Sequence, residues 1–392
     1  MNGNIGIKEN ERIFSIDVMR GFAILGIFLF NIYSFHTPYL YIDLYSLAEK
    51  PLDRIAFIFV DVFVQASFYP LFAFLFGYGM IILKTRIELR NLNYAQIMMR
   101  RMFLLLIIGV IHAFFIWSGD ILITYAVMGF IFILFANFSA KALSITGILL
   151  YLISNSLLSI LLVIMAKFVP SDELQLYNSV EADKASDIYQ HGSFFDVTTQ
   201  RMADWSFANG VASFIMYLFM ILPLFLLGAS FAKSNRLSKS KANDKFFTIL
   251  FGVTLPIGLW IKWIPYLFEK NYGFDQFQDL IGGPILTFAY ISLIYFLANL
   301  PASKNLLRPL ANVGKMSLSN YLFQSVVCSI IFFSYGFGLY GQVSYYQSNI
   351  LAIVIFFLQI IISSLWLKYY RMGPLEWIWR GFTYKSFNEI KR

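Results

Sequence analysis

The sequence has little charge and few of the residues that build soluble active sites. Charged residues make up 13% of its 392 residues, whereas soluble globular proteins carry about a quarter. The single cysteine, Cys328, lies in an apolar run, so no internal disulfide forms and packing is its expected role. The three histidines, His36, His112 and His191, have no metal-ligand spacing, and no Walker, Rossmann or Gly-x-Ser-x-Gly pattern occurs. We therefore expect neither a metal centre nor a soluble-type nucleophilic enzyme.

The sequence is instead rich in long apolar runs. Hydrophobic residues account for 59% of the chain, and runs long enough to cross a hydrocarbon core recur from Phe14 to Lys368. Asp17 and Arg20 interrupt the first run and no small-residue cleavage site clearly follows, so we expect a mature helix there. The pattern predicts an all-α, polytopic helical bundle in a lipid bilayer, with about ten spans. The expected spans are residues 14–36, 56–83, 102–117, 120–136, 143–166, 209–231, 247–267, 284–300, 316–338 and 349–368.

Lysine and arginine give the chain a net charge of +8, and their placement indicates topology. They gather in the connections around 84–101, 233–245 and 304–315 and beside the last span. All of these fall on one side under the expected helix count, so the positive-inside rule predicts that both termini are cytoplasmic. No nucleic-acid motif accompanies this charge, and we expect no nucleic-acid partner.

The longest connection, residues 167–208, is acidic and is predicted to lie on the extracytoplasmic side. It separates an N-terminal helical group, residues 14–166, from a C-terminal group, residues 209–392. The C-terminal group ends in an amphipathic cytoplasmic tail around Gly373–Arg380. We expect a single membrane domain, in which the acidic segment either covers an outward-facing cavity or links the two groups through solvent.

Polar residues inside the first span are candidates for function, because an ionisable group there costs roughly 2.5–3.5 kcal/mol on insertion scales. Asp17, Arg20 and Asn31 share one helical face. One hypothesis is that Arg20 contacts a phosphate or carboxylate and that Asn31 hydrogen-bonds near a reaction point. The other is a structural ion pair between Asp17 and Arg20, with an interhelical hydrogen bond at Asn31.

Two further polar pairs lie in later spans. Asp61 and Gln65 are one turn apart on one face of the second span, where such a pair needs a partner. Asn320 and Gln324 share a face of the ninth span, and interhelical hydrogen bonding is their expected role.

His112 is the histidine best placed for chemistry. It lies near the outer end of the third span, in a segment that continues through Trp117 to Asp120. Imidazole is suited to proton transfer near neutral pH, and Asp120 can fold back to orient it as a base. The alternatives are a hydrogen-bonded core histidine and an aspartate that only caps the next helix. His36 and His191 are expected to be ordinary interfacial or loop residues near the outer surface.

Three stretches of the sequence form a combined pattern: Ile16–Gly21 with Gly26 and Asn31, Gly109–Leu122 with His112, Trp117, Gly119 and Asp120, and Gly373–Tyr384. The stretch with Asp61, Gln65 and Phe76–Gly77 agrees with it. Together they resemble the YeiB-like family of bacterial membrane proteins, which has no settled function, and the similarity extends over nearly the whole chain. The family in turn looks related to transmembrane acyltransferases, among them heparan-alpha-glucosaminide N-acetyltransferase and bacterial surface-polysaccharide acyltransferases.

The resemblance implies acyl transfer across a bacterial cytoplasmic membrane, from cytoplasmic acyl-CoA to an acceptor on the far side. One departure affects the chemistry. The polysaccharide acyltransferases carry a histidine where this chain has Asn31, and asparagine cannot be a general base. The proton must then pass to His112 or His36, and His112 is preferred because it lies within the family pattern.

The predicted site therefore combines an acyl-CoA donor with an unidentified acceptor and no metal. His112 would be the base, Asp120 would orient it, and Asn31 and Asp61 would position the acceptor hydroxyl or amine. The alternative is a small-solute transporter or flippase that uses the same polar residues, although no clear internal repeat supports it. The sequence leaves homo-oligomer formation open. The residues expected to contact substrate are Asp17, Arg20, Gln65, Arg100, Arg101, Trp117, Asn320 and Gln324.

Overall fold

The computed structural model describes residues 13–169, 177–268, 271–387 and 389–392. In this part of the chain the fold is helical, apart from an isolated bridge between Tyr370 and Lys391. The helices are α1 (Phe14–His36), α2 (Pro51–Phe63), α3 (Phe68–Glu88), α4 (Tyr94–Phe115), α5 (Leu122–Phe132), η2 (Ile133–Phe135), α6 (Ala140–Phe168), α7 (Ser179–His191), α8 (Phe194–Ala208), α9 (Val211–Lys233), α10 (Lys241–Leu267), α11 (Tyr272–Phe277), η3 (Gln278–Gly282), α12 (Gly283–Asn299), η4 (Pro301–Ser303), α13 (Lys304–Lys315), α14 (Ser317–Phe332), α15 (Tyr345–Tyr369) and α16 (Pro374–Tyr384).

Among the described residues, eight helical segments are long and apolar enough to cross a membrane. Two shorter apolar helices, Leu122–Phe135 and Ser317–Phe332, coincide with the fourth and ninth expected spans. These helices confirm the predicted polytopic helical membrane bundle. Its exposed apolar side chains require a lipid bilayer around them.

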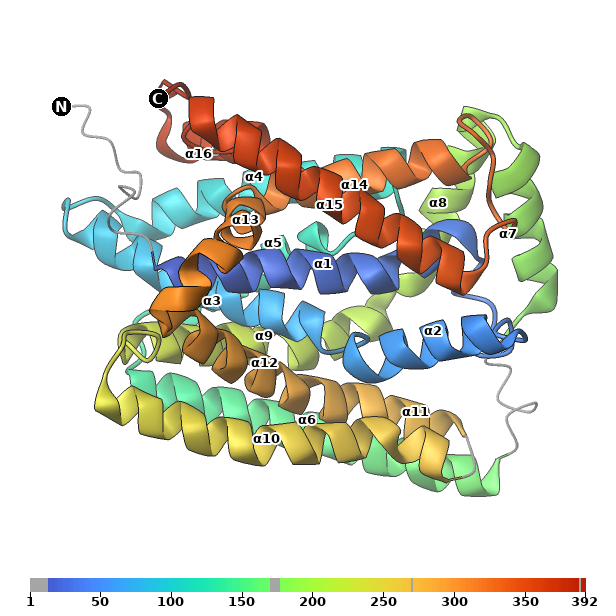
Figure 1. The fold of residues 1–392 in the computed structure, drawn as a ribbon, viewed down its shortest axis with the longest axis horizontal. Helices are drawn as coiled ribbons and strands as arrows, with labels where there is room; N and C mark the ends of the chain where they lie inside the picture. The colour runs from blue at the N-terminus through green and yellow to red at the C-terminus, as the bar shows by residue number, and fades with distance from the viewer. Residues whose placement is uncertain (1–12, 170–176, 269–270, 388) are drawn as a thin grey trace.

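Helix α1 lies at the centre of the bundle (Figure 1). It packs against α2, α3, α12, α13, α14 and α15, whereas α6 packs on α9 and α10 packs on α12 at one edge. Over half of the α1 span is buried inside the protein, against 17% of the α6 span. The polar residues of α1 therefore face other helices, while α6 presents its apolar side chains to lipid.

Glycines hold α1 close to α13. A Cβ atom on Gly21 would overlap the carbonyl oxygen of Leu310, and one on Gly314 would overlap the carbonyl oxygen of Asp17. Because no side chain separates the two backbones there, the first turns of α1 are fixed at one end of the bundle. Asp17 and Arg20 lie on these turns.

The two ends of the bundle differ in charge, as the sequence predicts. The start of α1, the α3–α4 and α9–α10 connections, α13 and α16 all lie at the end that carries the basic clusters (Figure 1). Helices α7 and α8, which belong to the acidic segment, lie at the opposite end. We call the first the basic end and the second the acidic end.

The second expected span lies within one apolar segment long enough to cross a membrane, Pro51–Glu88, but this segment is not one continuous helix. Helix α2 ends at Phe63 and α3 begins at Phe68. Between them Ala66 has a φ of 56°, a left-handed conformation that breaks the helical hydrogen-bond pattern. Hydropathy alone cannot show the break, but Pro70 in the first turn of α3 is a local signal for it, because proline has no N–H to donate to the Ala66 carbonyl oxygen.

His36 was expected to be an ordinary interfacial or loop residue, and the structure contradicts this expectation. It is 1% exposed at the end of α1, and its ring packs against Phe332 and Tyr345. His191, by contrast, is exposed and lies 3.1 Å from Asp187. Cys328 is buried without a disulfide, in agreement with a packing role.

Candidate functional site

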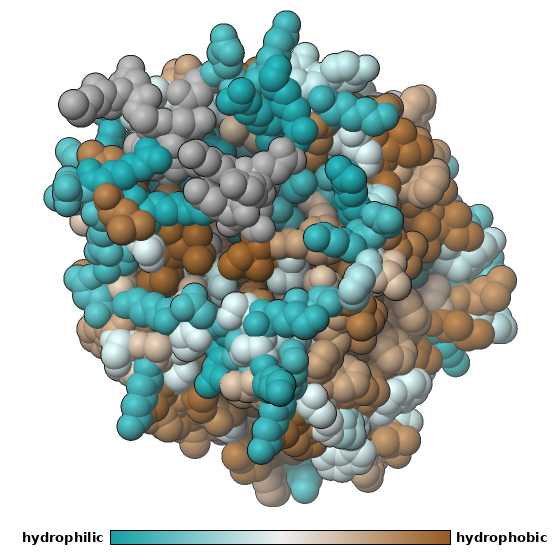
Figure 2. All heavy atoms as spheres, turned by 60° about the vertical axis from the view of Figure 1, so that its left-hand side comes forward, coloured by the Kyte–Doolittle hydropathy of each residue, from teal (hydrophilic) through white to brown (hydrophobic). Residues whose placement is uncertain are grey.

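A cavity of about 860 Å³ lies at the basic end of the bundle. Its walls come from α1, α3, α4, α5, α9, α13, α14 and α16, so segments from nearly the whole chain enclose it. Figure 2 shows this end of the molecule with polar side chains across the face and apolar atoms visible between them.

Positive charge dominates the polar part of the cavity wall. Seven basic and three acidic side chains line it, which leaves an excess of four positive charges in this set. Such an excess favours an anionic ligand. The basic residues are Arg20, Lys84, Arg86, Arg101, Lys233, Lys315 and Arg380, and the acidic ones are Asp17, Glu88 and Glu376.

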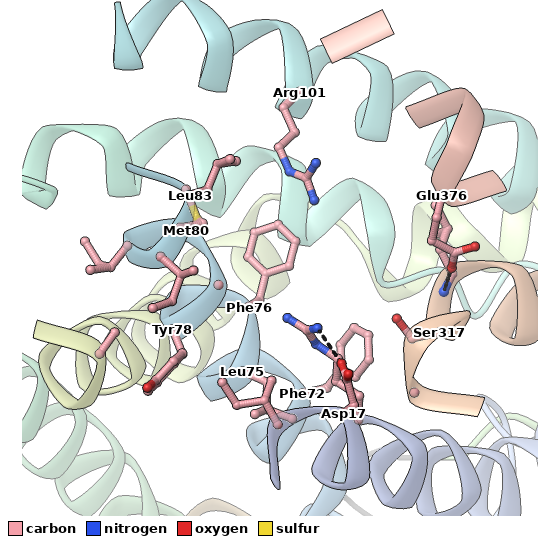
Figure 3. Close-up of a pocket in the computed structure, with 18 of the residues that line it drawn as sticks. Asp17, Phe72, Leu75, Phe76, Tyr78, Met80, Leu83, Arg101, Ser317 and Glu376 are labelled. Atoms are coloured by element: carbon pink, nitrogen blue, oxygen red, sulfur yellow. Dashed lines mark hydrogen bonds and ion pairs between the residues drawn. The ribbon is translucent and has the colours of Figure 1, made fainter. Parts of the chain in front are cut away.

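The rest of the wall is apolar and partly aromatic. Ile24 and Ile27 of α1 lie one and two turns beyond Arg20, and Phe72 and Phe76 of α3 also line the cavity. In Figure 3 the guanidinium of Arg101 points toward Phe76, so charged and apolar groups meet within the same space. The cavity therefore suits a ligand with an anionic part and an apolar part.

Arg20 extends from α1 toward α3. Its Nη1 lies 3.5 Å from Asp17 Oδ1, which confirms the predicted pairing, and its side chain is 30% exposed against 6% for Asp17. Gly79 of α3 leaves room for the guanidinium, because a Cβ atom there would lie 3.3 Å from Arg20 Nη2. The ion pair fixes one edge of the guanidinium, and its partial exposure leaves surface for an anion.

Arg101 joins α4 to α16. Its guanidinium stacks on the ring of Trp379 at 3.5 Å, and the Trp379 indole N–H donates to the Arg101 carbonyl oxygen at 2.9 Å. A guanidinium over an aromatic face keeps its N–H groups at the ring edge, where they remain available to acceptors. The predicted amphipathic tail is thus part of the cavity wall.

Glu376 fixes the other side of α16. It accepts hydrogen bonds from the backbone N–H groups of Leu318 and Ser319 at 2.7 and 3.0 Å and from the Ser319 hydroxyl at 2.5 Å. These donors belong to the first turn of α14, whose N–H groups have no helical partner. Burial raises the pKa of Glu376 above its ordinary value, although these hydrogen bonds act in the opposite direction.

The hypothesis that Asp120 contacts His112 agrees with the structure. His112 Nδ1 lies 2.7 Å from Asp120 Oδ2, and both side chains are 0% exposed. Asp120 Oδ1 accepts from the backbone N–H of Ile123 at 2.8 Å, so the same carboxylate also caps α5. Because an ionised carboxylate only accepts, the proton of a neutral imidazole belongs on Nδ1. Within the described residues, His112 Nε2 has no hydrogen-bond partner.

One aromatic residue separates His112 from the cavity. Tyr321 of α14 lines the cavity, and its ring centroid lies 5.1 Å from that of His112. The Tyr321 hydroxyl lies 3.4 Å from the Gly119 carbonyl oxygen, beside the turn that carries Asp120. The pair of His112 and Asp120 is therefore one side chain behind the cavity wall.

Of the residues predicted to bind substrate, three line the cavity: Asp17, Arg20 and Arg101. Arg100 does not, and its Nε instead donates to the Gln96 carbonyl oxygen at 3.3 Å. Trp117 lies toward the acidic end, stacked on Phe35 at 4.2 Å. The remaining candidates, which the structure places elsewhere, are Asn31, Asp61, Gln65, Asn320 and Gln324.

Asn320 and Gln324 join α14 to α15, as interhelical hydrogen bonding predicts. Asn320 Nδ2 donates to Ser363 Oγ at 3.1 Å, and Gln324 Nε2 donates to Gln359 Oε1 at 2.8 Å. Gln359 Nε2 donates in turn to the Asn320 carbonyl oxygen at 2.8 Å. These amides satisfy one another between two helices and do not reach the cavity, so the substrate-contact hypothesis for them has no support in the structure.

Sequence reasoning missed several residues of the site. Tyr321 and Trp379 could not be identified, because apolar and interfacial aromatics have ordinary packing roles in most membrane proteins. Lys262 was missed although a signal was present, since it is an ionisable residue inside the seventh expected span. It lies apart from the cavity, with Asp61, Gln65 and Asp279.

Comparisons with known proteins identify the family. Residues 231–386 match a family described as "Protein of unknown function (DUF418)". The chain is 34% identical over 98% of its length, and 97% of the relative's, to the uncharacterized protein YxaH of Bacillus subtilis. It is 30% identical over 96% of its length, and 95% of the relative's, to an uncharacterized 39.9 kDa protein of Bacillus acidopullulyticus. It is also 29% identical over 96% of its length, and 97% of the relative's, to the uncharacterized protein YeiB of Escherichia coli. The chain belongs to this YeiB-like, DUF418 family of multi-pass membrane proteins.

Proposed function

We propose that this protein is an acyltransferase of the bacterial cytoplasmic membrane, which moves an acyl group from cytoplasmic acyl-CoA to an acceptor near the outer leaflet. The observation that carries the proposal is the cavity at the basic end, in which arginines and an apolar wall meet beside a buried pair of His112 and Asp120. The positive-inside rule assigns this end to the cytoplasm, where acyl-CoA is available.

The cavity matches the two parts of an acyl-CoA molecule. Its phosphates require guanidinium or ammonium groups, and Arg20, Arg101 and Arg380 supply guanidiniums at the wall. Its acyl chain requires an apolar surface, which Ile24, Ile27 and their neighbours supply. A small charged solute would leave the apolar wall without a partner, whereas an acyl thioester uses both.

His112 would act as general base, with Asp120 as its positioning residue. The lone pair on His112 Nε2 takes the proton of an acceptor hydroxyl or amine while the acceptor atom attacks the thioester carbonyl carbon. The carbon–sulfur bond breaks, and the leaving CoA thiolate takes the proton from the imidazolium. Asp120, 2.7 Å from Nδ1, stabilises the imidazolium formed between these steps.

Tyr321 would control access between donor and base. Tyr321 lines the cavity and its ring also lies beside His112, while its hydroxyl contacts backbone oxygens of the turn before α5, at Gly119 (3.4 Å) and at Ile121. A rotation of this side chain joins the cavity to the imidazole without moving a helix. In the absence of acceptor the same ring keeps the thioester away from His112.

The test is equilibrium binding of acetyl-CoA and palmitoyl-CoA to the purified protein in detergent. We expect saturable binding that weakens as salt is added, because phosphate contacts are charged. Arg20→Ala and Arg101→Ala should each weaken it about 10- to 100-fold, the range for one charge-assisted hydrogen bond. Arg100→Ala is the matched control, since Arg100 is the neighbouring arginine and does not line the cavity.

Three results would overturn the donor assignment: no binding to folded protein, binding with equal loss in Arg100→Ala and Arg101→Ala, or binding without any effect of Arg20→Ala. Transfer of the labelled acyl group to a membrane or cell-envelope acceptor then tests the reaction itself. Donor binding without transfer in membranes that contain candidate acceptors would contradict the enzyme and favour export of the amphiphile.

Transport or flipping of a small solute is the second candidate, and one observation favours it. A helix interrupted inside the bundle, as at residues 64–67, is a feature of transporter binding sites. Reconstitution into liposomes separates the two. Movement of a fluorescent acyl anion across the bilayer, with the thioester intact, would support transport, and acyl transfer to an acceptor would support the enzyme.

A further inference from the structure

A cluster of charged and polar side chains surrounds the break between α2 and α3, apart from the cavity. Lys262 Nζ donates to Asp279 Oδ1 at 3.2 Å and to the Gln65 carbonyl oxygen at 3.1 Å. Gln65 Nε2 donates to the other Asp279 oxygen at 2.7 Å. Asp61 Oδ2 accepts from the hydroxyl of Tyr266 and the amide of Gln278, each at 2.6 Å.

The broken backbone is part of this cluster. The left-handed Ala66 interrupts the helical hydrogen bonds. The Val64 carbonyl oxygen accepts a turn bond from the Ser67 N–H at 3.1 Å, and those of Phe63, Gln65 and Ser67 accept from side chains. Side chains from α12 and α10 supply the donors: Tyr290 to Phe63 at 2.6 Å, Thr287 to Ser67 at 2.6 Å, and Lys262 to Gln65. On the opposite side of the cluster, Asp279 lies in η3, a π-helical turn of the same chain and a second departure from α-helical geometry. Two irregular segments thus meet at one ammonium group.

The cluster has an unbalanced charge when all three groups are ionised. Asp61 and Asp279 contribute two negative charges and Lys262 one positive charge, and Asp61 and Asp279 lie within electrostatic reach of each other. Lys262 is 0% exposed, and the Asp279 side chain retains 23% exposure. Other titratable groups that face the cluster in the described chain are Tyr33, Tyr69, Tyr151, Tyr266, Tyr290 and Asp275. Asp275 adds a further negative charge, and none of these groups adds a positive one.

We propose that Asp61, Lys262 and Asp279 form a proton-binding site inside the membrane domain. An uncompensated charge in a low-dielectric interior is costly, so one proton bound by the two carboxyl groups balances the set. Asp279, the more exposed of the two carboxyls, provides its route of entry and release.

A proton fits this cluster better than a metal cation does. In the described chain no group of three or more histidine, cysteine, aspartate or glutamate side chains could hold a metal. The oxygen atoms at the centre already accept from Lys262, whose ammonium takes the place that a monovalent cation would occupy between Gln65 and Asp279. A proton needs no coordination shell and no cavity.

Infrared spectroscopy of the purified protein tests the site directly. We expect a carbonyl-stretch band of a protonated carboxylic acid at pH 7 in the wild-type protein. The band should disappear in Asp61→Asn and in Asp279→Asn, because one carboxylate is then balanced by Lys262. Asp196→Asn is the control, because this exposed carboxylate of α8 takes no part in the cluster, and it should leave the band unchanged. Lys262→Met should retain or strengthen the band, because it removes the balancing charge.

The wild-type spectrum is decisive even where a variant does not fold. Absence of a protonated carboxyl at pH 7 would overturn the proposal, as would a band that survives both Asp61→Asn and Asp279→Asn. A wild-type protein without the band, whose thermal midpoint rises with sodium but not with lower pH, would assign the balancing charge to a metal cation and also overturn it.

Discussion

His112 Nδ1 and Asp120 Oδ2 lie 2.7 Å apart across the turn that joins α4 to α5. Close packing at Gly109, one turn before His112, permits this contact. A Cβ atom on Gly109 would lie 2.7 Å from the backbone nitrogen of Ile123 and 3.1 Å from Asp120 Oδ1. The start of α5 therefore rests directly on α4, and the carboxylate reaches the imidazole because no side chain intervenes.

Replacement of the pair should affect the reaction more than the binding of the donor. If His112 is the base, His112→Gln should lower the rate of acyl transfer about 10²- to 10⁴-fold, the usual contribution of general base catalysis. Asp120→Asn should also lower it, because the amide favours the wrong imidazole tautomer. Acyl-CoA affinity should change less than twofold, since neither residue lines the cavity. Wild-type transfer rates in a folded His112→Gln variant would exclude the base role.

Gly109→Ala should destabilise the protein and slow the reaction together. The added methyl group must displace the backbone of α5, and such overpacking costs typically 1–3 kcal/mol. Gly252→Ala is the control, because a Cβ atom there meets nothing within 4 Å. Alanine in an open helical position should be neutral or stabilising. Thermal unfolding in detergent compares the two, and equal midpoints would show that α4 and α5 tolerate a wider separation.

The spans and the charge asymmetry follow from the sequence because they depend on local composition. A run of apolar residues must form a helix in lipid whatever its neighbours are. The break at residues 64–67 does not follow, because its donors come from Lys262, Thr287 and Tyr290, about two hundred residues further along the chain. Pro70 favours an interruption locally, since it cannot donate to the Ala66 carbonyl oxygen, but the contacts that complete the break are tertiary.

In the candidate site, too, contacts between residues close in sequence could be predicted and contacts between distant residues could not. Spacing in the sequence is enough to pair Asp17 with Arg20 and His112 with Asp120. The first two residues lie within one helical turn, and the other two lie across one short connection. The sequence predicts an acceptor-positioning role for Asp61 and a substrate contact for Gln65, yet they bind Gln278 and Asp279 in the cluster at the break. An ionisable residue in a span indicates that a partner exists, but its position in the chain does not identify the partner.

Gly79 should be as important to donor binding as the arginine it faces. Gly79→Val places a branched side chain where the Arg20 guanidinium now lies, 3.3 Å from the expected Cβ position. We expect acyl-CoA affinity to fall by about the same factor as in Arg20→Ala. The double variant should lose little more than either single variant, because both changes remove one interaction. Additive losses in this cycle would show that Gly79 and Arg20 act independently.

The acidic segment should make stability depend on pH through Asp204. This residue of α8 accepts from Tyr41 and Gln200 at 2.7 and 2.8 Å and from Tyr189 at 2.6 Å, which fastens α8 to α7 and to the segment after α1. Burial raises the pKa of Asp204 above its ordinary value, although these three donors act to lower it. Its carboxyl is therefore harder to ionise in the folded protein than in the unfolded chain.

The sign of the effect follows from proton binding. From the ordinary aspartate pKa of about 3.9 up to the raised folded value, the folded state holds more protons, so stability falls as pH rises. Thermal midpoints between pH 4 and 7 should show a shallower fall in Asp204→Asn than in the wild-type protein. Asp196→Asn is the control, because the Ser193 hydroxyl lowers the pKa of Asp196 and the stability from that contact is lost only below about pH 3.9. The Asp196→Asn curve should therefore run parallel to the wild-type curve in this window. Equal slopes for all three proteins would mean that Asp204 ionises as readily in the folded state as in the unfolded chain.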